Sequence, residues 1–271
     1  MVTLLCTVRD CRQALNREER RLVCTRGHSF DIARSGYCNL LQPQDRRSRQ
    51  PGDSADAVAA RRRFLDQGFG DFIWRAVPMA PLSAPVLDVG CGEGHYTGAM
   101  QRDLGVEAHG VDISVPAIDA AARKHRHCFF VVANADRFLP YADRSFGLVT
   151  SITSRMNPEE FRRVLADDGR ALVALPGTDD LVELREAILG EGKLIDRVER
   201  TVETFASHFA LERHERARNV VHLDREAVHD VMASSYRGLR ASQRDRLDAI
   251  NELDVTLSRD LLLFRPTSYR S

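Results

Sequence analysis

The sequence predicts an α/β protein with a doubly wound, mostly parallel β-sheet and a small cysteine-bearing module ahead of it. Three features predict this fold. From about residue 84, short apolar segments alternate with segments of helical periodicity, which is the pattern of a parallel sheet with crossover helices. A glycine-rich turn follows the first apolar segment. Three of the six cysteines lie within the first 24 residues, which have no long periodic segment.

The expected elements follow in chain order. A polar, proline-containing segment at 42–53 precedes Ser54, which can cap a helix at 55–67. Strands are then expected at 86–89, 106–111, 128–133, 146–152 and 171–175, with helices at 95–103, 115–124 and 158–165. Beyond residue 177 we expect helices at 179–189 and 225–233, and strands within 209–223 and at 255–264. The chain thus divides into a module at 1–41, a linker and helix at 42–83, and an α/β domain at 84–271.

Length and charge limit the class of protein. The 271 residues have room for one α/β domain and a smaller appendage. The 39 basic and 39 acidic residues cancel, so a nucleic-acid partner would need a local basic patch. No apolar run reaches the roughly 18 residues of a membrane span, and the N-terminus lacks the basic start of a secretory signal. We therefore expect a cytoplasmic protein without a membrane partner.

The glycine-rich turn has the order Asp88-x-Gly90-x-Gly92-x-Gly94 between a predicted strand and a predicted helix. Glycines allow a sharp turn and a close approach to a ligand, and the helix N-terminus presents free N–H groups. Dinucleotide enzymes space these glycines as Gly-x-Gly-x-x-Gly. The tighter spacing here is typical of class I, Rossmann-like methyltransferases, which seat the amino-acid end of S-adenosylmethionine. A plain glycine turn and a nicotinamide enzyme are the alternatives.

Polar residues after the next two strands support a nucleoside site. Asp112 lies about 20 residues beyond the turn, where a carboxylate can accept hydrogen bonds from ribose hydroxyls. Asn134 follows the third strand and is placed to meet the adenine edge. The predicted cofactor-binding residues are Asp88, Gly90, Cys91, Gly92, Glu93, Asp112, Ile113, Asn134 and Ala135.

A cysteine–histidine cluster precedes the sheet. Cys6-x4-Cys11, followed after twelve residues by Cys24-x3-His28, offers three thiolates and an imidazole. Zinc favours such a tetrahedral set, and a segment of about 40 residues with little core gains folding energy from a metal. The alternative is a set of buried free cysteines beside a surface histidine.

These residues are part of a longer similarity. The segments 27–33, 36–41, 47–54 and 60–66, together with the loop at 88–96, resemble the large-subunit rRNA guanine-N1 methyltransferases of the RlmA type. The resemblance covers most of the chain, and the linker segment is its most specific part. It implies zinc at Cys6, Cys11, Cys24 and His28, and cofactor contacts at Gly92 and Glu93. It also implies homodimers that methylate a guanine in a hairpin loop of ribosomal RNA.

Arginines are concentrated in the N-terminal quarter of the chain. The first 63 residues contain thirteen arginines and seven acidic residues. The densest group is Arg46, Arg47, Arg49, Arg61, Arg62 and Arg63. Such a strip beside a zinc module fits phosphate contacts with an RNA hairpin, whereas the alternative is a solvated helix face and an exposed loop.

The favoured function is therefore methyl transfer from S-adenosylmethionine to guanine N1 of large-subunit rRNA, as a housekeeping or an antibiotic-resistance activity. The sequence singles out no catalytic base. A methyltransferase of the same build that acts on a small molecule is the alternative. The zero net charge supports this alternative, as does the segment 153–158, which departs from the family pattern where the substrate base is expected. A non-catalytic zinc-containing RNA-binding protein is a third possibility.

Overall fold

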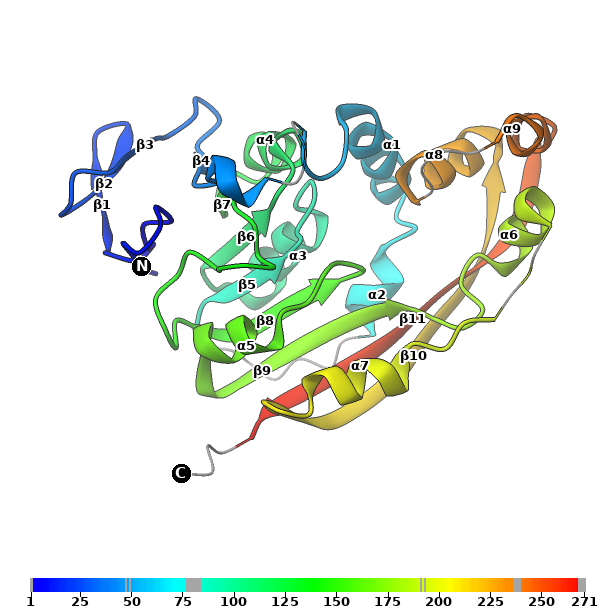
Figure 1. The fold of residues 1–271 in the computed structure, drawn as a ribbon. Helices are drawn as coiled ribbons and strands as arrows, with labels where there is room; N and C mark the ends of the chain where they lie inside the picture. Colours follow the sequence, from blue (N-terminus) through cyan, green and yellow to red (C-terminus); the bar gives the residue numbers. More distant parts are fainter. Residues whose placement is uncertain are drawn as a thin grey trace.

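Figure 1 shows the computed structural model of the chain, which describes residues 2–46, 48, 50–76, 84–190, 192, 194–235 and 240–267. Its centre is an eight-stranded sheet in the order β10-β11-β9-β8-β5-β6-β7-β4. The strands are β4 (Cys38–Asn39), β5 (Val86–Val89), β6 (Ala108–Asp112), β7 (Phe129–Val132), β8 (Phe146–Ile152), β9 (Leu165–Pro176), β10 (Phe209–Asp224) and β11 (Glu252–Pro266). Only the pairs β9–β11 and β10–β11 are antiparallel, so the predicted mostly parallel sheet is confirmed.

Helices fill the crossovers between the parallel strands. They are α3 (His95–Leu104), α4 (Val115–Lys124) and α5 (Pro158–Val164). Local signals fix their ends: Ser114 accepts a hydrogen bond from the amide of Ala117 at the start of α4, and Gly105 ends α3 in the left-handed conformation. Strand β5 lies between β6 and β8, so the direction of winding changes on either side of it. In open α/β sheets the ligand crevice forms at this switch point.

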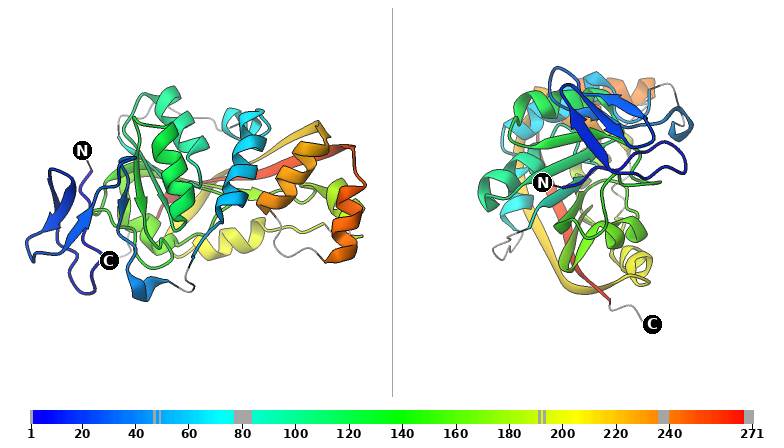
Figure 2. Two further views of the ribbon diagram at one scale, coloured as in Figure 1. Left: turned by 90° about the horizontal axis from the view of Figure 1, so that it is seen from above. Right: turned by 90° about the vertical axis from the view of Figure 1, so that its left-hand side faces the viewer.

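The N-terminal module is a small three-stranded antiparallel sheet. Its strands are β1 (Leu15–Glu18), β2 (Arg21–Cys24) and β3 (Ser29–Asp31). The chain then enters the main sheet, because β4 pairs in parallel with β7. A bridge between Leu4 and Tyr141 adds a second connection. The module therefore lies at one end of the molecule, against the β4 edge of the main sheet (Figures 1 and 2).

The C-terminal part forms a second structural region at the opposite end of the molecule (Figure 2). Strands β10 and β11 make a long hairpin, and α6 (Val182–Leu189), α8 (Arg225–Ser235) and α9 (Ala241–Asp248) contribute to a separate hydrophobic core along it. The linker helix α1 (Ala55–Asp66) adds Phe64 to this core. Arg63 of α1 donates two hydrogen bonds to the carboxylate of buried Asp230 in α8, at 3.0 and 2.5 Å. The linker helix is thus attached to the C-terminal region.

Every strand and helix that the sequence predicts is present, with shifts at the ends. The largest shift is in β9, which covers 165–176 where 171–175 was expected. Next come α6, which begins at Val182 where residue 179 was expected, and β11, which begins at Glu252 where residue 255 was expected. Short elements were missed: β1 to β3, β4, the 3₁₀ turn η1 (Pro43–Asp45), α2 (Asp71–Arg75), α7 (Val198–Phe205) and α9. None of the described helices is long and apolar enough to cross a membrane.

Candidate functional site

A cavity of about 710 Å³ opens at the carboxyl ends of β5 to β8. Its size and position suit a small-molecule ligand at the switch point of an α/β sheet. Residues from four consecutive parallel strands reach it, at or just after the point where each strand ends. The linker supplies a further wall through Gly52, Asp53 and Arg61. Eight of the nine predicted cofactor residues line this cavity: Gly90, Cys91, Gly92, Glu93, Asp112, Ile113, Asn134 and Ala135.

The glycines of the loop are required by conformation and by space. Gly90, Gly92 and Gly94 have φ values of 72°, 55° and 79°, in the left-handed region that disfavours side chains. A Cβ atom at position 90 would lie 1.7 Å from Oγ of Ser154. The loop therefore packs closely against Ser154 while its residues line the cavity, and α3 begins immediately after it.

Asp112 fixes the loop from the end of β6. Its Oδ2 accepts a hydrogen bond from the amide of Gly92 at 3.0 Å, and its Oδ1 accepts one from the amide of Ser114 at 2.8 Å. Burial raises the pKa of this carboxyl, and the two amide donors act against that rise. Each carboxylate oxygen has further lone pairs, so the group can still accept hydroxyl donors from a ligand.

Asn134 contacts the linker as well as the cavity. Its Nδ2 donates to the carbonyl of Asp45 at 2.9 Å, and its Oδ1 accepts from the amide of Asp136 at 3.1 Å. The side-chain amide that was expected at an adenine edge thus holds the η1 turn of the linker beside the cavity.

Asp88 differs from the other predicted cofactor residues, because it lies beneath the loop and is only 1% exposed. Its carboxylate accepts hydrogen bonds from the hydroxyls of Thr97 at 2.7 Å and Thr150 at 2.9 Å. Burial raises its pKa to about 6. Asp88 therefore joins β5, β8 and α3 below the cavity and is not one of its lining residues.

The linker places a cation over the glycine loop. Arg61 donates from Nε to Glu93 at 2.8 Å and from Nη1 to Asp53 at 2.6 Å. Burial alone would lower the pKa of Arg61, but the Glu93 carboxylate raises it above its usual range, so the guanidinium stays charged. Arg61 and Asp53 were not predicted as residues of this site, and Arg61 was expected in an RNA-binding strip.

The opposite wall follows β8 and consists of residues 152–155. Thr153 has a φ of 52°, which is costly for a β-branched residue and is often found at functional sites. Arg155 comes next, with a side chain that is 77% exposed and a single 3.5 Å contact to Asp136 among the described residues. This is the segment where the sequence predicts the substrate base.

The ionised side chains of the described residues give the cavity an excess of negative charge. In this part of the chain, four carboxylates and two guanidinium groups line it: Asp53, Glu93, Asp112, Asp136, Arg61 and Arg155. S-adenosylmethionine carries a sulfonium and an ammonium against one carboxylate, so its net charge is positive. The residues present therefore fit this cofactor in both shape and charge.

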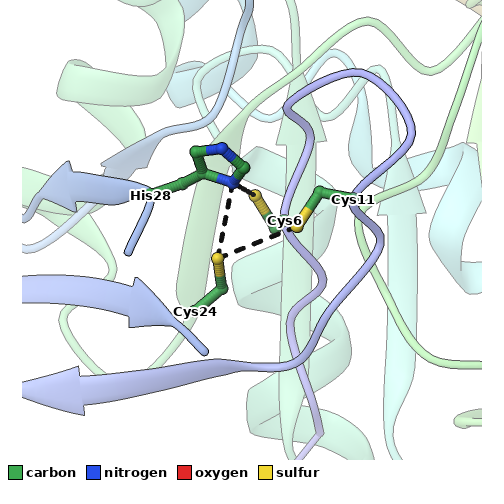
Figure 3. Close-up of side chains that lie close together, drawn as sticks. All are labelled: Cys6, Cys11, Cys24 and His28. Carbon is green, nitrogen blue, oxygen red and sulfur yellow. Dashed lines mark hydrogen bonds between the residues drawn. The ribbon is translucent and has the colours of Figure 1, made fainter. Parts of the chain in front are cut away.

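The four predicted zinc ligands come together in the N-terminal module (Figure 3). Their ligand atoms all lie within 4.8 Å of one another. Two turns bring them there: Gly27 has a φ of 80° and donates its amide to the carbonyl of Cys24, and the amide of Cys11 donates to Val8. Asp10, beside Cys11, has a φ of 59°. These turns explain how a Cys-x4-Cys spacing places both sulfurs on one side.

Three of the distances between ligand atoms in this cluster match the edges of a tetrahedral zinc site. Zinc at about 2.3 Å from sulfur and about 2.0 Å from nitrogen gives edges of about 3.8 Å between sulfurs and about 3.5 Å between sulfur and nitrogen. Sγ of Cys11 and Sγ of Cys24 are 3.8 Å apart. Nδ1 of His28 lies 3.4 Å from Sγ of Cys6 and 3.5 Å from Sγ of Cys24. The residues therefore fit the metal.

The predicted arginine strip is only partly available to a partner. Arg46 is exposed, and Arg47 and Arg49 lie outside the described residues. Arg62 is exposed and pairs with Asp66 at 3.4 Å. Arg61 and Arg63 also pair with acidic residues of this protein, and the Arg63 side chain remains 52% exposed. Contact of residues 61–63 with RNA phosphates stays a prediction. Their partners belong to the folded structure and could not be read from local sequence.

Comparison with protein families gives two matches. Residues 86–173 match the family described as "Methyltransferase domain", and residues 5–49 match the family described as "RlmA, N-terminal", a zinc ribbon. The first match covers β5 to most of β9, and the second covers the cysteine–histidine module and the start of the linker.

Known proteins are similar over nearly the whole chain. A 23S rRNA (guanine(748)-N(1))-methyltransferase of Streptomyces fradiae is 34% identical over 94% of this chain and 95% of its own. YxjB of Bacillus subtilis strain 168, provisionally named a 23S rRNA (guanine-N(1)-)-methyltransferase, is 32% identical over 90% of each chain. Among solved structures, the YcgJ protein of Bacillus subtilis has the same fold, with a TM-score of 0.52 and 17% identity over 75% of this chain and 100% of its own.

Proposed function

Because the chain belongs to the RlmA-type family of 23S rRNA (guanine-N1)-methyltransferases, we propose that its substrate is a guanine of large-subunit ribosomal RNA, methylated at N1. The chain is an S-adenosylmethionine-dependent methyltransferase with an N-terminal zinc ribbon. One observation carries the choice of substrate: the similarity to the rRNA enzymes extends through the zinc ribbon and linker, which lie outside the methyltransferase-domain match.

We assign the cavity residues to the cofactor by their chemistry. The loop from Gly90 to Glu93 would receive the amino-acid end, and Asp112 would accept from the ribose hydroxyls. Ile113, Asn134 and Ala135 would border the adenine. Cys6, Cys11, Cys24 and His28 would hold zinc in the ribbon.

S-adenosylmethionine supplies an electrophilic methyl group when bound, and the protein must align guanine N1 in line with it. The wall at 152–155 is the side of the cavity left for the base. Guanine N1 carries a proton near neutral pH, which must pass to a base or to a water molecule, and its loss leaves negative charge spread over N1 and O6. The guanidinium of Arg155 lies on this wall of the cavity. There it would stabilise the negative charge on the deprotonated guanine and contact the guanine edge.

Incubation of the protein with methyl-labelled S-adenosylmethionine tests the substrate. Deproteinised large-subunit RNA should become labelled, and nuclease digestion should release 1-methylguanosine, because guanine N1 is the proposed nucleophile. A matched reaction with cell metabolites is the comparison. Label confined to the metabolite fraction would support a small-molecule methyltransferase and reject the RNA proposal.

Replacing Arg155 with glutamine should lower kcat/KM for RNA about 10- to 100-fold, the usual range for losing one arginine contact to guanine. S-adenosylmethionine affinity should stay within a factor of about two, because Arg155 lies on the substrate wall. Arg144→Gln is the matched control: Arg144 is also exposed and also contacts an aspartate at 3.5 Å, but it does not line the cavity. Equal rates for Arg155→Gln and Arg144→Gln would remove Arg155 from substrate recognition.

We also propose that the protein acts in the cytoplasm, where ribosomal RNA is found, and that it is a homodimer. The second proposal is supported by family resemblance, and the molar mass in solution tests it.

A further inference from the structure

The guanidinium of Arg61 lies against the glycine loop. A Cβ atom at position 92 would lie 3.2 Å from Nη2 of Arg61 and 3.5 Å from its Cζ. The guanidinium therefore rests against the Cα of Gly92. Because Arg61 also lines the cavity, it forms part of the surface that faces a ligand at the loop.

Two carboxylates hold the guanidinium in one orientation. Glu93 binds Nε and Asp53 binds Nη1, and Glu93 is only 3% exposed. In the part of the chain that the structure describes, no protein group accepts a hydrogen bond from Nη2. Nη2 is also not among the fully buried atoms, and Arg61 is one of the residues that line the cavity, so this nitrogen is available to a ligand. A fixed guanidinium with one donor edge directed at a cavity is suited to a carboxylate.

The amino-acid end of the cofactor carries such a carboxylate. The left-handed glycines allow that end to approach the backbone at residues 90–94, which is where Arg61 lies. Among the described residues, the other guanidinium that lines the cavity is that of Arg155, which comes from the wall after β8. We propose that Arg61 binds the α-carboxylate of S-adenosylmethionine through Nη2, while Asp53 and Glu93 hold it in position.

This inference rests on S-adenosylmethionine as the cofactor, and the test separates the two claims. Binding of S-adenosylmethionine and of its decarboxylated analogue, S-adenosyl-3-methylthiopropylamine, is measured by calorimetry for the wild-type protein and for Arg61→Gln. The wild type should bind the carboxylated form about 10- to 100-fold more tightly, the range of a charge-assisted hydrogen bond. In Arg61→Gln this preference should fall to within about threefold, mainly through weaker binding of S-adenosylmethionine.

Two control variants test whether the preference for the carboxylated ligand depends on a residue other than Arg61. Arg62→Gln removes the neighbouring exposed arginine of α1, and Arg155→Gln removes the other guanidinium of the cavity; both should keep the wild-type preference. If Arg61 only ties the linker to the loop, its loss should weaken both ligands equally. That result, or a preference lost in Arg155→Gln instead, overturns the proposal. Failure of the wild type to bind S-adenosylmethionine at all would count against the proposed function itself.

Discussion

Replacing Asp112 with alanine is expected to weaken S-adenosylmethionine binding at least about 100-fold, because two charge-assisted hydrogen bonds to the ribose would be lost. The same carboxylate accepts the amides of Gly92 and Ser114, so the loop would also lose the group that fixes its shape. Isothermal titration calorimetry with S-adenosylmethionine and with S-adenosylhomocysteine measures the effect, and both ligands should be weakened alike because both carry the ribose.

Two further variants distinguish the loss of a contact with the ligand from a defect in folding. Asp112→Asn keeps one acceptor oxygen and nearly the same volume, so it should fold and still bind at least about 10-fold more weakly than the wild type. Asp143→Ala removes an exposed carboxylate outside the cavity lining and should leave the affinity unchanged. Thermal unfolding without ligand shows whether each variant is folded. A folded Asp112→Asn protein with wild-type affinity would contradict the ribose assignment.

The parts of this site that are formed by consecutive residues could be predicted from the sequence. The strand, the glycine turn and the helix at 86–104 are specified by consecutive residues, so their spacing alone indicates the cavity. Asp112 could be found because β6 pairs in parallel with β5, which brings their carboxyl ends together. The cysteine–histidine spacing predicted a ligand set that the fold does bring within metal-binding distance.

The missed residues depend on contacts between distant segments. Arg61 comes 32 residues before Glu93, and only the packing of α1 beside the loop joins them. Arg63 and Asp230 are 167 residues apart and meet because α1 packs on α8. An arginine triplet predicts a basic surface when the acidic residues that pair with it in the folded protein are not known. Short elements such as β4, with two residues, have too few positions to show a period, yet β4 connects the zinc ribbon to the main sheet.

This connection gives the zinc ribbon two roles that can be tested separately. The cavity-lining residues begin at Ser48, beyond the metal ligands, so cofactor binding does not require the ribbon directly. The ribbon itself has three strands of three or four residues, and it adds only a few side chains to a hydrophobic cluster that continues into the main sheet: Cys6, Cys11, Leu15, Leu22 and Cys24. We therefore expect its folding to depend on the metal and its surface to contact RNA.

Replacing Cys24 with serine is expected to lower the zinc content from about one per chain to near zero and to unfold residues 2–31. Structural zinc contributes on the order of 10 kcal/mol in small modules, which is more than such a core can replace. Elemental analysis measures the metal, and hydrogen exchange should show fast exchange at β1 to β3 with β5 to β8 still protected. Methylation of RNA should be lost, whereas S-adenosylmethionine affinity should stay within about threefold, because the cavity lies outside the ribbon.

Cys128→Ser is the matched control for this change. Cys128 lies outside the cluster, and the one side-chain hydrogen bond described for it is a 3.9 Å contact from its sulfur to the carbonyl of Thr97. That variant should keep its zinc, its exchange pattern and its activity. Full RNA methylation by a zinc-free, unfolded ribbon in Cys24→Ser would show that the ribbon does not serve RNA recognition. A metal content equal to that of the wild type would instead exclude Cys24 as a ligand. Because the two outcomes concern different measurements, the metal site and the RNA role can be rejected independently.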